Sequence, residues 1–437
     1  MYKFLFSPFF NFFKDHRIQV DIKFFSFLVF LLPIALITGP AVPDIIISIC
    51  ALYFLIKSIF FKLWKYYQNP YTWIFLVFCG YAIVRSITSE FPNESLTNEG
   101  SVFYFRYLFF SLSLWYFLEN VNTFSKCLLN IILICLAIVS IDGMYQYFVG
   151  VNFFGYPKFS NDPNRLTGLF GDEPIIGRYV SYLSIFAFYL IYKSYNLSKK
   201  IIIYSIALLV LGEVFVFFSG ERAPLLYVSL FSLLIVIYIP HFRFYRLIGI
   251  FISLSLIAII LYFNPSAKER IIDQSISQMS QTKFPFLPYS EEHERHYVAA
   301  LKMFHDKTIF GVGTNLFRYH CEEQKYQYKQ GSCTSHPHNY YIQILAELGI
   351  FGFLFLFFCY LYLCYNALVQ LFFQIRSKPS NTMSFDKFLI ILILLVYWWP
   401  LIPHMSFFNN WNSVFLMIPI GFFLKNLYGN EDIVSEF

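Results

Sequence analysis

Charged side chains are scarce in this chain. Only 13% of its 437 residues are Asp, Glu, Lys or Arg, and 58% are hydrophobic. A soluble globular domain usually carries about 25% charged residues. The composition therefore excludes an ordinary soluble protein and indicates an integral membrane protein. The net charge of +6 is spread thinly, so we interpret it as a topology signal and not as a nucleic-acid-binding patch.

Other sequence signals are also absent. We see no internal repeat and no C-x2-C pair of the kind that holds structural zinc. The first apolar run begins near Phe24, and no small-residue cleavage site follows it. We therefore expect a retained first span and not a cleaved signal peptide. Most of the eight cysteines lie in or beside apolar runs, where they act as small buried hydrophobic residues.

Long apolar runs dominate the rest of the chain. A spanning helix needs roughly 20 apolar residues. We count about twelve candidates, which begin near Phe24, Asp44, Tyr71, Ser101, Phe124, Pro174, Ile201, Pro224, Leu247, Asn339, Phe388 and Asn410. The sequence predicts an all-α polytopic membrane protein with about 12 transmembrane helices. The first nine fall in residues 1–263, one large loop follows over 264–338, and the last three fall in residues 339–437.

Basic residues orient these spans. They gather in alternate loops: Lys57, Lys62, Lys65, Lys193, Lys199, Lys200, Arg243, Arg246, Arg376, Lys378 and Lys387. The positive-inside rule assigns these loops, and both termini, to the cytoplasmic side. The segments 149–173, 219–224 and 264–338 then face outward. Span parity therefore predicts that Arg222 and His338 lie on the same outer face.

A polar stretch stands at the mouth of one long apolar helix. It consists of His336, Pro337, His338, Asn339 and Tyr340 and continues to Glu347, Gly349 and Gly352. Titratable groups at a membrane boundary are costly unless they are used. A neutral imidazole can accept a proton at working pH, so we favour a general base at His338. A helix cap or an ordinary surface histidine remains the alternative.

Four arginines are candidates for binding an anion. Arg222 stands in a short turn, where guanidinium could grip phosphate, snorkel to lipid headgroups or pair with the neighbouring Glu221. Arg295 follows the acids that open a predicted helix, and a solvated charge is its alternative. Arg165 and Arg178 flank a stretch rich in glycine and acids, and ordinary helix capping would explain much of that pattern. Arg178 would lie about one turn inside a span, where the cost of burying a charge favours a functional role over ordinary capping.

The long loop after residue 264 has a composition of its own. Most of the nine histidines lie there: His293, His296, His305, His320, His336 and His338. Ser290 and the acids after it predict a helix start, and Tyr297, Val298, Leu301 and Phe304 predict its apolar stripe. His and Cys residues near the loop end match no common zinc spacing, so we expect no metal site. We expect a disulfide between Cys321 and Cys333 in an oxidising compartment.

Two motifs resemble those of the O-antigen ligase family, which shares a superfamily with the lipid-linked O-antigen polymerases. The first is R-x3-L, here Arg222 to Leu226. The second is H-[N/S/Q]-x9-G-x2-[G/Y], here His338 and Asn339 followed by Gly349 and Gly352. Both stand in the expected order and on the predicted outer face.

The resemblance implies a fold, a reaction and a set of site residues. The family consists of helical membrane glycosyltransferases that move a polysaccharide from undecaprenyl-pyrophosphate to the lipid A core, on the periplasmic face of the bacterial inner membrane. The transfer is inverting and independent of metal or other cofactors. The resemblance makes His338 the base and Arg222 and Arg295 the pyrophosphate ligands. We expect the remaining substrate contacts from Arg165, Arg178, His336 and Asn339. The implied partners are the lipid-linked donor, the lipid A core or another glycan acceptor and membrane lipids, with no nucleic acid.

Two other functions remain open. A polymerase of the same superfamily would join repeat units on the carrier. Such enzymes are described with R-x10-G in their outer loops, and that spacing is absent after Arg165, Arg178, Arg222, Arg270 and Arg295. A transporter of lipid-linked sugars would more often show an internal repeat and charges near the membrane midplane.

Overall fold

The computed structural model describes residues 2–97, 100–282, 289–376 and 383–429, and most of these are helical. The helices are α1 (Tyr2–Lys14), α2 (Val20–Phe30), α3 (Leu32–Ala35), α4 (Ala41–Phe60), α5 (Pro70–Ile87), α6 (Pro92–Thr97), α7 (Arg106–Asn120), α8 (Phe124–Val149), α9 (Ile176–Ser194), α10 (Lys199–Phe218), α11 (Arg222–Tyr238), α12 (Pro240–Phe263), α13 (Pro265–Lys268), α14 (Gln274–Ser280), α15 (Glu291–Asp306), α16 (Phe317–His320), α17 (Tyr340–Ile375), α18 (Phe385–Tyr397) and α19 (Asn410–Tyr428). Short 3-10 helices lie at Leu36–Thr38, Trp64–Tyr67 and Gly168–Phe170, and a short π-helix spans Glu269–Asp273.

Seven helices in the described ranges are long and apolar enough to cross a membrane. They are Val20–Thr38 together with α4, α5, α8, α10, α12 and α17. The all-α, multi-pass membrane class is therefore confirmed. The other five expected spans correspond to α7, α9, α11, α18 and α19, which are shorter or less apolar. A total of about twelve spans, and the placement of residues 264–338 in a periplasmic loop, stay predictions. Residues 283–288, 377–382 and 430–437 of the predicted ranges lie outside the described residues.

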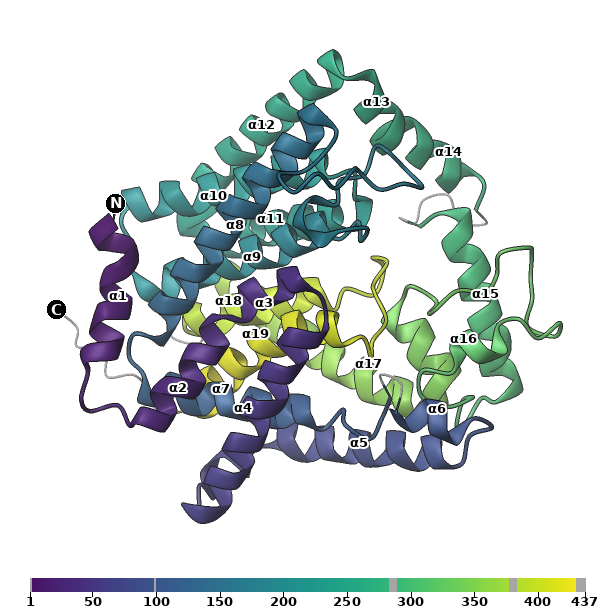
Figure 1. Ribbon diagram of the computed structural model, residues 1–437, viewed down its shortest axis with the longest axis horizontal. Helices are drawn as coiled ribbons and strands as arrows, with labels where there is room; N and C mark the ends of the chain where they lie inside the picture. Colours follow the sequence, from purple (N-terminus) through teal and green to yellow (C-terminus); the bar gives the residue numbers. More distant parts are fainter. Residues whose placement is uncertain (1, 98–99, 283–288, 377–382, 430–437) are drawn as a thin grey trace.

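Two of the five other helices are enclosed by protein. Every residue of α9 from Ile176 to Ile191 is buried, and so is every residue of α19 from Trp411 to Asn426. Figure 1 shows α9, α18 and α19 inside the assembly, with α12 along its edge. A helix that is enclosed by protein on all sides can carry Tyr, Ser and Asn, since neighbouring helices satisfy them. Four residues of α12 are buried (Phe242, Arg246, Gly249 and Ser253), and its exposed surface is apolar, as suits contact with lipid.

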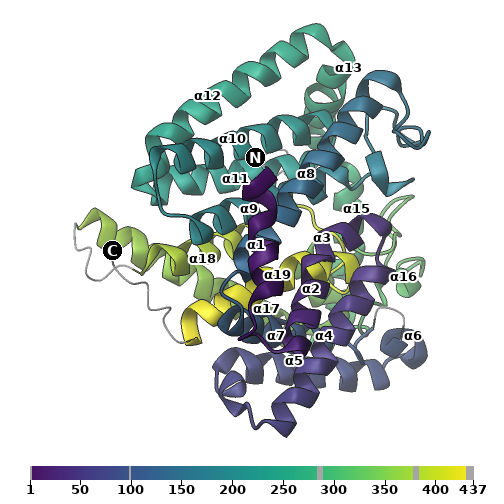
Figure 2. The ribbon, with the colours of Figure 1, turned by 60° about the vertical axis from the view of Figure 1, so that its left-hand side comes forward.

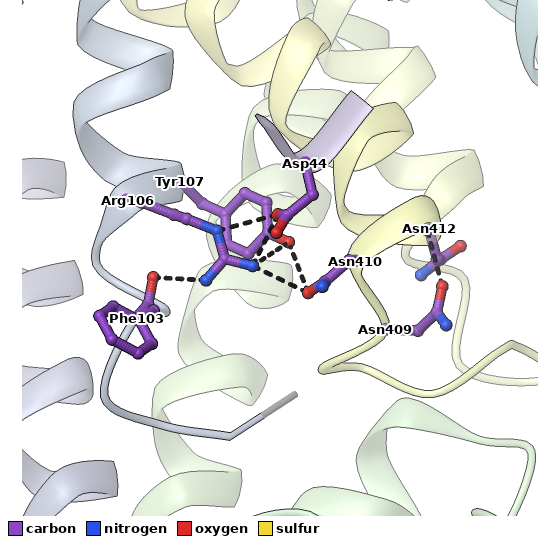
Figure 3. A network of polar contacts seen from close by, with 7 residues as sticks. All are labelled: Asp44, Phe103, Arg106, Tyr107, Asn409, Asn410 and Asn412. Carbon is purple, nitrogen blue, oxygen red and sulfur yellow. Dashed lines mark hydrogen bonds and ion pairs between the residues drawn. The ribbon is translucent and has the colours of Figure 1, made fainter. Parts of the chain in front are cut away.

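Two polar networks join helices at their packed faces. In Figure 3, Arg106 at the start of α7 forms an ion pair with Asp44 of α4 at 2.7 Å. It also donates to the Oδ1 of Asn410 at the start of α19, at 2.9 Å. In the second network, Arg246 pairs with Glu213 and links α12 to α10. Arg246 is fully buried, so its expected place in a solvent-facing loop is wrong, because α12 begins earlier than the apolar run suggested.

The segment around α15 forms a small domain-like cap on α17 (Figures 1 and 2). Ser290 accepts from the backbone of His293, whose side chain in turn accepts from the Ser290 N–H, which makes a capping box. The predicted helix is therefore present. The predicted apolar stripe is not the buried face of the helix, since Leu301 is exposed whereas Ala299, Ala300 and Met303 are buried. Small alanines let α15 approach its neighbours closely, and they form a second core with Val312, Leu316, Phe317 and Ala346.

Candidate active site at the start of α17

His338 occupies a sharp backbone turn just before α17. Its φ is +56°, one of three positive values among non-glycine residues in the described ranges. The next residue, Asn339, caps the helix by accepting from the N–H groups of Tyr341 and Ile342 at 3.0 and 3.2 Å. Its amide donates to the carbonyl of Pro400 at 2.7 Å, and the N–H of His404 donates to the carbonyl of His338 at 2.8 Å. The loop between α18 and α19 therefore holds this unusual conformation in place.

Four imidazoles gather around this turn. The ring of His338 lies 4.2 Å from that of His336, 5.4 Å from that of His293 and 5.6 Å from that of His296, centroid to centroid. His293 and His296 come from α15, so the cap and the start of α17 build the cluster together. His296 Nδ1 lies 3.1 Å from the carbonyl oxygen of Ser332, which fixes its ring.

Burial makes these imidazoles weak bases that stay neutral. Burial, helped by His296 and Arg178, lowers the pKa of His338 to about 4. Burial and the neighbouring His338 and His296 lower the pKa of His293 to about 3. Burial likewise places the pKa of His336 well below its ordinary value. A neutral imidazole at neutral pH can accept a proton, which is the state that a general base requires.

Three arginines lie together beside the imidazole cluster, and we call Arg165, Arg222 and Arg270 the arginine group. Arg165 and Arg270 both act electrostatically on Arg222. The guanidinium of Arg222 donates to Gln278 Oε1 at 2.5 Å and to the Arg270 carbonyl at 3.1 Å, and its Nε has no partner within the described residues. Asp162 pairs with Arg270 at 3.1 Å, and Glu292 acts electrostatically on both Arg222 and Arg270. These carboxylates neutralise part of the charge of the three arginines.

A cavity of about 180 Å³ adjoins the arginine group. Its polar lining includes Lys158, Asn164 and Arg270. His293 lies between this region and His338, because Arg222 acts electrostatically on His293 and the His293 ring contacts the His338 ring. The structure therefore brings Arg222, Arg165 and His338 to one end of the helical assembly. Cationic groups around a cavity of this size can hold a phosphate-type anion.

The other two predicted arginines have different surroundings. Arg295 forms an ion pair with Glu291 at 3.0 Å and donates to the carbonyl of Gln330 at 2.9 Å. Its guanidinium is thus engaged by Glu291 and Gln330, whereas Arg222 and Arg165 donate to Gln278 and to the Pro174 carbonyl. Arg178 is buried in α9 and acts electrostatically on His336, His338 and His404.

Gly349 of the second motif serves the docking of the cap. Gly349 has φ +65°, and a Cβ there would stand 2.3 Å from the carbonyl oxygen of Ile309. The N–H of Ile350 donates to the Thr308 carbonyl at 2.9 Å. Glu347 is fully buried and accepts from the N–H groups of Asn315 and Phe317 at 2.9 and 3.2 Å. This part of the motif therefore fixes the segment after α15 against α17.

Cys321 and Cys333 form a disulfide, with their Cα atoms 4.9 Å apart. The bond closes the loop that leads into His336 and His338. His336 itself contacts the Ser335 hydroxyl through Nδ1 at 2.9 Å, and its Nε2 lies 3.4 Å from the His404 carbonyl. Within the described residues, no group of three or more His, Cys, Asp or Glu side chains is arranged to hold a metal ion.

Sequence reasoning missed several residues of this region. His404 and Arg270 were given no role, although one holds the His338 backbone and the other belongs to the arginine group. His293 and His296 were noted only as loop histidines. The helical spacing of His293 and His296, three residues apart on one face of a capped helix, is the one signal that could have paired them.

Comparison with known proteins agrees with these motifs. A family model described as O-antigen ligase matches residues 205–357. The match runs from α10 to the early part of α17 and contains Arg222, Arg295 and His338, whereas Arg165 and Arg178 lie before it. No curated protein matches the chain. That family consists of membrane glycosyltransferase-type enzymes with lipid-linked glycan substrates, and the chain is similar to it over the matched residues.

Proposed function

We propose that this protein is an O-antigen ligase that moves a polysaccharide from undecaprenyl-pyrophosphate to the lipid A core, or to another glycan acceptor, at the periplasmic face of the inner membrane. The observation that carries the proposal is the neutral imidazole of His338, held in a fixed backbone turn beside the arginine group. A base and a cationic anion-binding region are the two parts that this reaction requires.

In the proposed step, an acceptor hydroxyl oxygen attacks the anomeric carbon of the donor sugar. The bond from that carbon to the pyrophosphate oxygen breaks, and the pyrophosphate leaves with the electron pair. His338 takes the proton of the hydroxyl, a contribution of about 10²–10⁴ in rate. Attack opposite the leaving group inverts the configuration at the anomeric carbon. The atoms and electrons of this step balance without a metal or a cofactor.

Arg222 and the rest of the arginine group would stabilise the negative charge that develops on the pyrophosphate. The unpartnered Nε of Arg222 and the adjoining cavity support this role. We propose that Arg295 acts from α15, where it donates to the Gln330 carbonyl in the loop that contains Ser332. We propose that His336 and Asn339 shape the side of the site on which the acceptor binds. An apolar cavity of about 470 Å³, lined by α5, α17, α18 and α19, offers room for part of a carrier lipid tail.

A deletion strain complemented with variants tests the proposal. The wild-type chain should restore polymer on lipid A, and His338→Ala should leave long polymer on the undecaprenyl carrier while lipid A stays bare. A matched His305→Ala strain controls for the loss of a histidine, because His305 is exposed on α15 away from the cluster. Loss of all long chains in the deletion strain would instead identify a polymerase. Unchanged glycan profiles would reject both.

A further inference from the structure

A short hairpin after α8 exposes three aromatic side chains. Its residues 151–157 are closed by a backbone bridge between the two end residues. At its tip, Phe153 is 58% exposed, Phe154 75% and Tyr156 52%. Neighbouring exposed aromatic side chains leave a large apolar surface in contact with solvent, and such surfaces mark sites of contact with a partner or a membrane.

The backbone donors of the hairpin are paired without water. The N–H of Asn152 donates to the Tyr156 carbonyl at 2.9 Å, and the N–H of Gly155 donates to the Asn152 carbonyl at 3.0 Å. The side-chain oxygen of Asn152 accepts from the N–H groups of Phe154 and Tyr156, both at 2.9 Å. Water can pair with the N–H groups of a solvated loop, whereas a segment in lipid must satisfy its own. The hairpin meets that requirement for these four donors.

The hairpin folds back along α8, which is one of the helices able to span a membrane. The N–H of Phe153 donates to Oδ1 of Asp142 at 3.0 Å, and the Phe153 ring stacks on Tyr145 with centroids 4.5 Å apart. Asp142 precedes the last residue of α8, Val149, by two helical turns, or about 10 Å along the helix axis. The tip of the hairpin therefore lies beside the last two turns of the span and not beyond its end.

The face of α8 that carries Tyr145 is itself exposed and apolar. Ile138, Ile141, Tyr145 and Phe148 recur at helical spacing and are all exposed. On a membrane-spanning helix, such a face contacts lipid. Because Phe153 stacks on Tyr145, the hairpin continues the lipid-facing surface of α8.

The end of α12 lies next to the same region. The amide of Asn264, just after α12, donates to the hydroxyl of Tyr147 on α8, and Tyr262 and Phe263 are largely exposed. Aromatic side chains gather in this way at membrane–water interfaces. Lys158, which follows the hairpin, donates to the Tyr147 carbonyl at 3.0 Å. Tyr147, Lys158 and Asn264 all line the cavity of about 180 Å³ beside the arginine group.

We propose that the hairpin 151–157 inserts Phe153, Phe154 and Tyr156 into the lipid at the membrane interface and holds the edge of this cavity at the level of the headgroups. The partner is the bilayer itself, namely the upper acyl chains and glycerol region of the surrounding phospholipids. Continuity with the exposed faces of α8 and α12 favours lipid over a second copy of the chain. The inference goes beyond the proposed function, because it concerns the placement of the cavity in the membrane and not the reaction.

Photocrosslinking of the full-length protein in vesicles of phosphatidylethanolamine and phosphatidylglycerol tests the proposal. Phe154→p-benzoylphenylalanine keeps an aromatic ring at the tip, and irradiation joins it to whatever covers it. Phe251→p-benzoylphenylalanine, on the exposed middle of α12, is the lipid-facing control. Gln324→p-benzoylphenylalanine, exposed in a charged loop of the cap, is the water-facing control. Mass spectrometry should find phospholipid adducts at positions 154 and 251 and none at position 324.

Two crosslinking results would overturn the proposal. One is a main product that joins position 154 to a second chain, which would make the hairpin an interface between copies. The other is the absence of any adduct at position 154 in vesicles where position 251 is labelled, which would place the tip in water.

Thermal melting in the same vesicles gives an independent test. Phe154→Asp should melt at a lower temperature than Phe154→Leu, because it brings a charge into the lipid. Gln324→Asp adds the same charge at a water-facing position and should melt as the wild type does. Equal melting temperatures for the two Phe154 variants would contradict insertion. Neither readout depends on transfer activity, so the hairpin can pass these tests in a chain that fails as a ligase.

Discussion

Replacement of Gly349 by alanine should be among the most damaging single changes in the second motif. The residue has φ +65° and ψ −162°, a region that is nearly exclusive to glycine. A Cβ there would also lie 2.3 Å from the carbonyl oxygen of Ile309 and 2.5 Å from its carbonyl carbon. Both are backbone atoms, so the conflict cannot be relieved by rotating a side chain.

The cost can be built from two parts. Strain of the backbone at such an angle costs about 1–3 kcal/mol. Moving the Ile309 segment away would also break the bond from Ile350 N to Thr308 O, worth about 1 kcal/mol. Gly349→Ala should therefore lose about 2–4 kcal/mol of stability. Transfer activity should fall too, because this contact docks the α15 cap that carries His293 and His296.

Substitutions at two other glycines distinguish the cost of backbone strain from the cost of a Cβ that collides with neighbouring atoms. Gly171 has φ +64° but open space where a Cβ would stand, so Gly171→Ala should show the strain alone. Gly80 lies inside α5 with ordinary φ and open space, so Gly80→Ala should be neutral or slightly stabilising. Thermal melting in one detergent would rank the three variants. If Gly349→Ala melts no lower than Gly171→Ala, the argument from the close Ile309 contact is refuted.

Three further outcomes are expected. His338→Ala and Arg222→Ala should each reduce transfer by about 100-fold or more, with normal insertion by membrane fractionation, whereas His336→Ala should be milder; near-normal transfer in either of the first two would reject its role. Serine at both Cys321 and Cys333 should lower stability by about 3 kcal/mol for a loop of this length, seen as a lower melting temperature that reductant no longer changes. A metal chelator should not change transfer by the purified protein. Inhibition by the chelator would show that the reaction requires a metal ion, contrary to the proposal.

The sequence predicted the helices well because apolar runs report local structure. Two candidate spans were expected to begin near Phe124 and Asn410, and α8 and α19 begin at these residues. The sequence could not separate helices enclosed by protein from helices that face lipid, since both are apolar. Burial of α9 and α19 depends on which neighbours surround them, and that is decided by tertiary packing.

The candidate site was predicted in part for a related reason. Span parity and two motifs were enough to place Arg222 and His338 in one region. Arg270, His293 and His404 join them only because the segment after α12, the cap helix and the loop before α19 fold back over the same end of the assembly. No spacing in the chain encodes those long-range contacts. Arg246 shows the reverse error, since a basic residue counted as a loop signal is buried against Glu213.

The pH dependence of transfer should reveal how bound substrate changes the pKa of His338, the proposed base. In the free protein His338 has a pKa of about 4, mainly because it is buried. It therefore stays neutral as pH falls through the ordinary histidine pKa of about 6.5, and kcat/KM should lose its base only near pH 4. The same lowered pKa means that folding stability is full above about pH 6.5 and is lost progressively toward pH 4, because the unfolded chain takes up the proton first.

An anion bound beside His338 favours the protonated imidazole and raises its pKa. The acid limb of kcat, which reports the substrate complex, should therefore lie at higher pH than the acid limb of kcat/KM, which reports the free protein. Melting temperatures across the same pH range would separate loss of the base from loss of the fold. Coincident limbs in a protein that remains folded would mean that no substrate anion approaches His338. The base would then work with the low basicity that burial alone gives it, and the arginine group would have to act on more distant parts of the substrate.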